Sequence, residues 1–260
     1  MNQQEMKELL KQHGYYVFGT GYVARMLYRA LQKQGLLNNL QAFCRSKTTS
    51  GETFLDVPVI SAEEALRSGK PVLLGIHDGS SSTVPHADRM IRVYPYLKDW
   101  LFGEPLKREQ TINIEEIRRK QPEDQYWIAA RYAGIEGIAE NDPKKKEIYL
   151  RAMSMHCSRE TAQRRLELLK TLMSEAEKNG LDPGRPVILD AELRIIDGLH
   201  RLAVAAWLNI EKIQADIYPV SDVFTELFGE NNRLSEVVLR KNGFTEPEIA
   251  YLKECKRKCG

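Results

Sequence analysis

Apolar positions in the first hundred residues form short runs that alternate with segments of helical spacing. Residues 15–18 (YYVF) are a short apolar run, a glycine turn follows at residues 19–21, and apolar positions in residues 22–34 then recur every three or four residues. A short apolar run bounded by turn residues is typical of a buried strand, and the wider spacing is typical of an amphipathic helix. The pattern therefore predicts a strand, a turn and a helix that ends at Gly35.

The same alternation continues beyond this helix. We predict further strands at residues 40–44, 57–60 and 71–76, and a helix that begins after Ser61, which is suited to cap it. Strands that alternate with helices favour a parallel sheet covered on both faces. The polar loop at residues 77–82 (HDGSSS) follows a strand, where ligands bind in doubly wound sheets, although an ordinary surface loop explains it equally well.

The second part of the chain has a mixed pattern. Residues 111–117 (TINIEEI) alternate between apolar and polar positions and predict a strand. Residues 148–178 are helical, with a split near Cys157-Ser158 and an end at Asn179-Gly180. We further predict strands at 187–189, 193–196 and 213–218, a helix at 200–208, and two or three helices in 221–260 with a break at Gly243. Trp127 and Tyr132 have helical spacing and are expected in the core.

Composition and charge narrow the function classes. The 260 residues carry 38 basic and 36 acidic groups, for a formal net charge of +2, so no global field attracts nucleic acid or an anionic membrane. No apolar run approaches the roughly 18 residues that span a bilayer, and residues 1–14 lack the apolar stretch of a secretory signal. We therefore expect no membrane span and a cytoplasmic protein.

Cys255 and Cys259 lack nearby ligands for zinc, and we expect a frayed basic tail there.

The glycine turn after the first strand is a candidate ligand site. Gly19-x-Gly21-x-x-Ala24 fits the dinucleotide fingerprint, in which glycines let a phosphate approach the free amides of a helix start. The second strand ends in Arg45 where an acidic residue should contact the ribose of NAD, which disfavours NAD(P) and hydride transfer. Gly19, Thr20, Gly21 and Arg45 are the candidate ligand residues. Glycines that serve only tight packing are the alternative.

Residues 14–78, with their VFGTG start and DVPVISAEEAL helix entry, resemble the small Rossmann-like modules attached to sugar-modifying acyltransferases and methyltransferases of surface-polysaccharide pathways. The resemblance implies binding of a nucleotide-sugar, or docking alone. It also implies a place in polysaccharide biosynthesis or sugar metabolism.

Residues 197–201 (DGLHR) form the more informative constellation. Gly198 permits a sharp turn at a helix start, and the guanidinium of Arg201 can grip two phosphate oxygens beside the free amides. His200 can donate a hydrogen bond or move a proton near neutral pH. Asp197 can hold Mg²⁺ or orient the histidine. A purely structural role for His200 and Arg201, in capping and ion pairing, is the alternative.

The segment IIDGLHRLAVAAWLNIEKIQADI resembles the strand, DGxHR turn, alanine-rich helix and strand of the ParB/sulfiredoxin-like nucleotide-binding fold. Members include DNA-partition clamps, the sulfinic-acid repair enzyme and kinases that phosphorylate free serine. The resemblance implies that Gly198, His200 and Arg201 bind nucleotide phosphates. Leu199 stands where the repair enzyme has a cysteine, which disfavours sulfinic-acid reduction. The kinases carry an acidic residue after the domain's first strand, which acts as the base. The resemblance implies Glu123 for this role, with Asp124 as the alternative. An acidic side chain that is simply exposed to solvent would explain Glu123 as well.

Together these features predict an α/β chain of three parts: a Rossmann-like module at 1–105, an α+β ParB/sulfiredoxin-like domain at 106–220 and a helical tail at 221–260. The leading hypothesis is a phosphotransferase that uses ATP or ADP with Mg²⁺ to phosphorylate a small hydroxyl compound, with Glu123, Asp197 and His200 as catalytic residues. We expect a small-molecule substrate and contacts between copies of the chain. A non-catalytic nucleotide-binding or scaffolding protein and a ParB-like DNA-binding protein are the alternatives.

Overall fold

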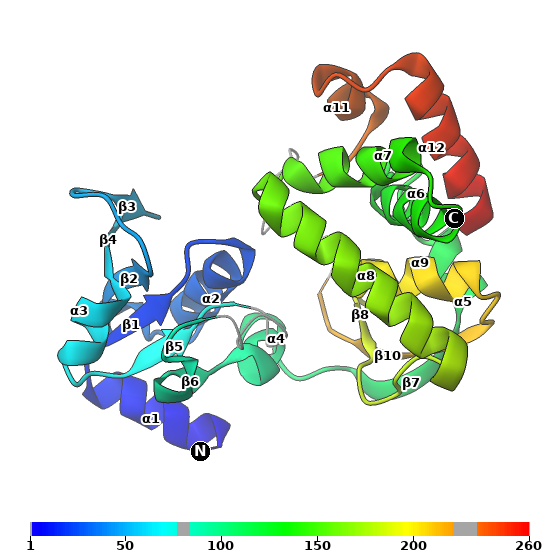
Figure 1. The fold of residues 1–260 in the computed structure, drawn as a ribbon. Helices are drawn as coiled ribbons and strands as arrows, with labels where there is room; N and C mark the ends of the chain where they lie inside the picture. Colours follow the sequence, from blue (N-terminus) through cyan, green and yellow to red (C-terminus); the bar gives the residue numbers. More distant parts are fainter. Residues whose placement is uncertain (1, 77–83, 221–232, 260) are drawn as a thin grey trace. The chain divides into compact units, whose positions relative to one another are not determined.

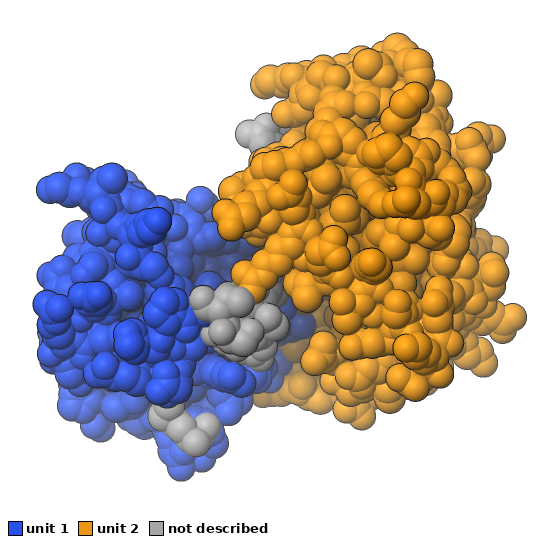
Figure 2. Space-filling model, in the orientation of Figure 1, with its two compact units in different colours: residues 1–103 blue, residues 104–260 orange. Residues whose placement is uncertain are grey.

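The computed structural model describes residues 2–76, 84–220 and 233–259. The fold is mixed α/β, and the chain divides into two compact units, residues 1–103 and 104–260 (Figure 2). The described helices near the C-terminus belong to the second unit. The loop expected at residues 77–82 and the segment 221–232 lie outside the described residues.

Unit 1 contains a mainly parallel sheet (Figure 1). Its strands are β1 (Tyr15–Phe18), β2 (Leu40–Arg45), β3 (Thr53–Phe54), β4 (Val57–Ser61), β5 (Val72–Leu74) and β6 (Ile91–Arg92), in the spatial order β3-β4-β2-β1-β5-β6. All pairings are parallel except that of β3 with β4. The predicted parallel strands are confirmed, whereas β3 and β6 are too short to give a pattern in the sequence.

Helices α2 (Tyr22–Lys33) and α3 (Ala62–Arg67) connect strands of unit 1, whereas α1 (Gln3–Gln12) precedes β1 and α4 (Tyr94–Phe102) follows β6. Two 3-10 turns, η1 (Leu37–Asn39) and η3 (Ala87–Arg89), also belong to this unit. Val23, Leu27 and Leu31 of α2 are almost fully buried, as the helical spacing predicts. The Ser61 hydroxyl accepts a hydrogen bond of 3.1 Å from the amide of Glu64, which confirms the predicted cap of α3.

Unit 2 contains a mixed sheet of β7 (Lys107–Asn113), β8 (Val187–Leu189), β9 (Ile195–Asp197) and β10 (Lys212–Ile217), in the order β7-β10-β8-β9. β10 is antiparallel to β7 and parallel to β8, and β8 and β9 form an antiparallel pair. The strand predicted at residues 111–117 is wrong in its second half. The Asn113 side chain accepts from the amide of Glu115 at 2.9 Å and caps a helix there, so the strand ends at Asn113.

The helices of unit 2 are α5 (Ile114–Arg119), α6 (Trp127–Ala139), α7 (Pro143–Ser154), α8 (Arg159–Asn179), α9 (Leu199–Trp207), α11 (Glu236–Lys241) and α12 (Glu246–Cys259). The predicted split near Ser158 is confirmed, because this residue caps α8 by accepting from the amide of Thr161. Gly180, with φ +76°, ends α8 as predicted, and Gly243 lies between α11 and α12. No described helix has both the length and the apolar character needed to cross a membrane.

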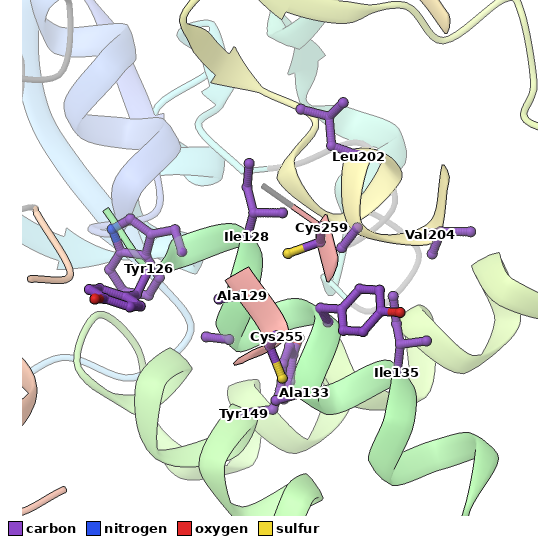
Figure 3. Close-up of a cluster of buried hydrophobic side chains, with 14 of the residues drawn as sticks. Tyr126, Ile128, Ala129, Ala133, Ile135, Tyr149, Leu202, Val204, Cys255 and Cys259 are labelled. Carbon is purple, nitrogen blue, oxygen red and sulfur yellow. The ribbon is translucent and has the colours of Figure 1, made fainter. Parts of the chain in front are cut away.

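Helix α6 is the centre of unit 2 and contacts α7, α9 and α12. It is buried on all sides, and a helix without a polar face belongs in a core. Two glycines let α7 come close: a Cβ at Gly134 would lie 2.8 Å from Cδ2 of Tyr149, and one at Gly137 would lie 2.7 Å from the amide nitrogen of Lys146. Figure 3 shows part of this core, with side chains from α6, α7, α9 and α12. Trp127 and Tyr132 are buried here, as predicted.

The C-terminal residues are folded, so the predicted frayed tail is wrong. Cys255 and Cys259 are fully buried on α12, and burial raises the pKa of both thiols to about 12. The side chain of Glu136 on α6, itself only 5% exposed, accepts hydrogen bonds from Tyr251 (2.6 Å), Lys258 (2.9 Å) and Lys145 (3.0 Å). This buried carboxylate ties α12 and α7 to α6, which is why the last helix does not fray.

Candidate functional site

The DGLHR turn joins β9 to α9 through a residue that must be glycine. Gly198 has φ +107°, and a Cβ there would lie 2.7 Å from Cγ1 of Val187. Gly198, the N-cap residue of α9, has no side chain with which to cap the helix. The first helical hydrogen bond is from the amide of Leu202 to the carbonyl of Gly198, so the amides of residues 199–201 precede the ladder. The Asp197 carboxylate accepts from the amide of Gly198 at 2.8 Å and stabilises the turn.

The guanidinium of Arg201 folds back over this turn. Its Nη2 atom lies 3.1 Å from the position that a Cβ on Gly198 would occupy, and its Nη1 atom donates a hydrogen bond to the carbonyl of Arg185. The glycine thus makes room for the guanidinium as well as for Val187. The structure brings together the elements of an anion site, namely helix-start amides and an adjacent guanidinium.

His200 faces the helices behind the turn. Its Nε2 atom lies 3.0 Å from the hydroxyl of Tyr149 on α7, and Nε of Arg131 on α6 donates to its Nδ1 atom at 3.4 Å. Arg131 is buried and also donates to the carbonyl of Trp127 at 2.8 Å, with its guanidinium 5.5 Å from the centre of the Trp127 ring. Sequence reasoning missed Arg131 and Tyr149, because neither lies near the DGLHR motif in the chain.

Two arginines lie near the partners of His200. Arg131 on α6 and Arg165 on α8 both act electrostatically on Tyr149 and on His156, which packs against Trp127. Loss of hydration, followed by the charges of Arg131 and Arg165, lowers the pKa of His156. Burial raises the pKa of Tyr149 to about 12, so its hydroxyl is neutral at physiological pH. Arg131 and Arg165 therefore place positive charge near Tyr149 and His156, although the whole chain is nearly neutral.

The candidate base Glu123 lies on the loop before α6. It is exposed, and its backbone carbonyl accepts from Lys256 of α12. Asp124 is also exposed and acts electrostatically on Lys256 and Tyr126. In the described residues no hydrogen bond or ion pair joins either acid to the DGLHR turn. The same loop reaches the start of β9, where the side-chain oxygen of Gln121 accepts from the backbone amide of Ile195 at 3.2 Å and its side-chain nitrogen donates to the carbonyl of Leu193 at 3.2 Å.

Asp197 supplies a single carboxylate for a metal ion. Among the described residues, no group of three or more His, Cys, Asp or Glu side chains converges as a metal site. Mg²⁺ in nucleotide sites commonly uses one or two carboxylates together with phosphate oxygens and water. Asp197 therefore fits a magnesium ion that arrives with a nucleotide.

The glycine turn of unit 1 joins β1 to α2. Gly19 has φ +107°, and a Cβ there would lie 2.9 Å from the carbonyl oxygen of Gly75, so this glycine is needed for packing. A Cβ at Gly21 meets no described atom within 4 Å, and its φ of −97° suits any residue. Thr20 is half-buried between them. The space at Gly21, at the start of α2, is open to a ligand.

Arg45 lies at the end of β2, as predicted, and is engaged by a neighbour. Its guanidinium forms an ion pair with Glu52, which also accepts from the hydroxyl of Thr49 at 3.2 Å. A phosphate bound at Arg45 would have to share the guanidinium with Glu52 or replace Glu52 in the ion pair.

Comparisons with known proteins do not add a family. No family model matches the sequence, and neither the curated proteins nor the solved structures gave a match.

Proposed function

We propose that unit 2 binds the phosphate groups of a nucleotide at the DGLHR turn. The observation that carries the proposal is the guanidinium of Arg201 folded back over the glycine turn at the start of α9. The cationic residues Arg131 and Arg165 behind the turn favour the same kind of ligand. The resemblance of IIDGLHRLAVAAWL to the ParB/sulfiredoxin-like unit supports a nucleotide in particular.

The reaction we propose is transfer of a phosphoryl group from ATP or ADP to the hydroxyl of a small compound. The acceptor oxygen attacks the terminal phosphorus, the bond to the leaving nucleotide breaks, and Glu123 takes the hydroxyl proton. Arg201 and the amides of residues 199–201 stabilise the charge on the transferring group. A magnesium ion held by Asp197 would neutralise phosphate charge when the nucleotide binds.

For unit 1 we propose a Rossmann-like ligand-binding module. Its parallel strands lie in the order third, second, first, fourth and fifth in the described part of the sheet, which matches the order of doubly wound nucleotide-binding sheets. The turn of Gly19, Thr20 and Gly21 lies at the carboxyl end of β1, where such sheets bind ligands. A sugar nucleotide is the ligand that the sequence resemblance favours.

Calorimetric titration with ATP, ADP and CTP, with and without Mg²⁺, tests nucleotide binding. Charge-assisted hydrogen bonds contribute about 1.5–3 kcal/mol each, so Arg201→Ala should weaken binding by roughly 10-fold to 150-fold. Arg194→Ala is the matched control, because this arginine lies on the β8–β9 hairpin and pairs with Glu192 at the surface. Identical traces for wild type and Arg201→Ala would end the proposal.

A nucleotide-binding protein without transferase activity is the second candidate. It is favoured by two observations: Glu123 has no described bond to the turn, and both ring nitrogens of His200 already have protein partners. Phosphate transfer assayed with Glu123→Ala and Asp124→Ala separates the two. A loss of transfer with retained nucleotide binding in either variant identifies the base, whereas binding without any transfer by the wild type supports the second candidate.

A further inference from the structure

The contact between Arg131 and His200 determines which ring nitrogen of the histidine carries a proton. A guanidinium has only donors, so in the 3.4 Å contact Nε of Arg131 donates and Nδ1 of His200 accepts. An accepting nitrogen carries no proton. The imidazole is therefore neutral, with its proton on Nε2.

The second contact agrees with this assignment. The Nε2–H group lies 3.0 Å from the hydroxyl oxygen of Tyr149 and donates to it. Tyr149 is fully buried, and its ring lies against Gly134, where a larger residue would collide with it. The acceptor is thus held at one place by the close approach of α6 and α7.

The donor is held as firmly. Arg131 is 8% exposed, its Nη1 atom donates to the carbonyl of Trp127 at 2.8 Å, and its guanidinium lies near the Trp127 ring. A flip of the imidazole in this tautomer would place Nε2–H against the guanidinium, which has only donors, and would lose the bond to Arg131. Among the described residues, the charged or titratable groups near this arrangement include Arg131 of α6, Tyr149 of α7, Arg165 of α8, and Asp197 and Arg201 at the turn.

We propose that Tyr149 and Arg131 are positioning residues that hold His200 as a single neutral tautomer, so that His200 anchors the DGLHR turn to α6 and α7 and does not move protons. Where this concerns phosphate binding, it rests on the proposed function. His200 then acts by fixing the backbone between Leu199 and Arg201, and the ligand is held by the amides and by the guanidinium of Arg201. Proton transfer falls to another group.

Nuclear magnetic resonance of the full chain with ¹⁵N-labelled histidine tests the tautomer. The chain has five histidines, and the His200→Gln variant assigns the signal of interest. At pH 7.5 we expect an unprotonated Nδ1 and a protonated Nε2 for His200 in the wild type. In Arg131→Met we expect signals averaged between the two tautomers, because the donor that makes Nδ1 an acceptor is lost. Tyr126→Phe is the matched control, since it loses a hydrogen bond to Glu236 instead and should leave His200 unchanged.

A wild-type His200 that is averaged between tautomers, or that carries its proton on Nδ1, overturns the inference. So does an Arg131→Met spectrum identical to that of the wild type. Pyrophosphate titration of the same samples separates this from the proposed function. If the protein binds pyrophosphate while His200 is averaged between tautomers, the positioning role is wrong and the phosphate site is retained. If His200 is a single tautomer but the protein binds neither pyrophosphate nor ATP, the tautomer assignment is retained and the phosphate site is wrong.

Discussion

Replacement of Gly198 by alanine tests whether the DGLHR turn has the geometry described. Two costs add at this position. A non-glycine residue in the left-handed region costs roughly 1–2 kcal/mol, and φ here is +107°. The new Cβ would also lie 2.7 Å from Cγ1 of Val187, a clash of the kind that costs about 1–3 kcal/mol in a packed core. We expect Gly198→Ala to lower the free energy of unfolding by about 2–5 kcal/mol.

Gly243→Ala is the matched control in the same unit. Gly243 has φ +74°, but the nearest atom to its Cβ position is Nη2 of Arg151 at 3.8 Å, an ordinary contact. Only the backbone cost of about 1–2 kcal/mol remains there. Urea unfolding, followed by circular dichroism and by tryptophan fluorescence, measures both variants. Equal losses of stability in the two variants would refute the close packing of Gly198 against Val187.

The remaining predictions concern charge. Burial alone would raise the pKa of Glu136, but hydrogen bonds from Tyr251, Lys258 and Lys145 outweigh burial and lower this pKa in the folded protein. The carboxylate therefore stabilises the fold fully above its ordinary pKa of 4.5, and this stabilisation is lost as the pH falls through the lowered pKa of the folded state. In urea unfolding at several pH values, Glu136→Gln should therefore cost about 2 kcal/mol or more at pH 7, with the gap to wild type closing in acid; a gap independent of pH contradicts this. Arg165→Gln should weaken pyrophosphate binding about threefold or more in calorimetry, whereas Arg164→Gln, its exposed neighbour on α8, should not; equal effects would place Arg165 outside the site. Glu52→Gln should release Arg45 from its ion pair and strengthen the binding of a sugar nucleotide to unit 1. Nuclear magnetic resonance titrations that follow the signals of unit 1 residues measure this affinity, and an unchanged affinity would show that Arg45 does not belong to the ligand site.

Elements with strong local signals were predictable from the sequence. β1, α2 and α9 have apolar runs or helical spacing bounded by glycines, and Ser158 supplied a cap signal for α8. The boundary at Asn113 was missed because TINIEEI satisfies strand alternation, while an asparagine followed by two glutamates also begins a helix. The folded C-terminus was missed because its cause, the buried Glu136, lies more than one hundred residues away in sequence.

The candidate site was predictable only where it is local. The glycine, the helix-start amides and Arg201 of the DGLHR turn lie within five residues, so the motif indicates them directly. Arg131 and Tyr149 contact His200 from two other helices, and Arg165 acts on Tyr149 from a third. Their approach depends on Gly134 and on the packing of α6 with α7, which no periodicity along the chain reveals.

An anion bound at residues 198–201 would be visible in a crystal structure of the full chain with a non-hydrolysable ATP analogue and Mg²⁺. We expect phosphate density against the amides of residues 199–201 and within hydrogen-bond distance of the Arg201 guanidinium. Density only at the Gly19–Gly21 turn, or an Arg201 that turns away from a bound phosphate, would contradict it.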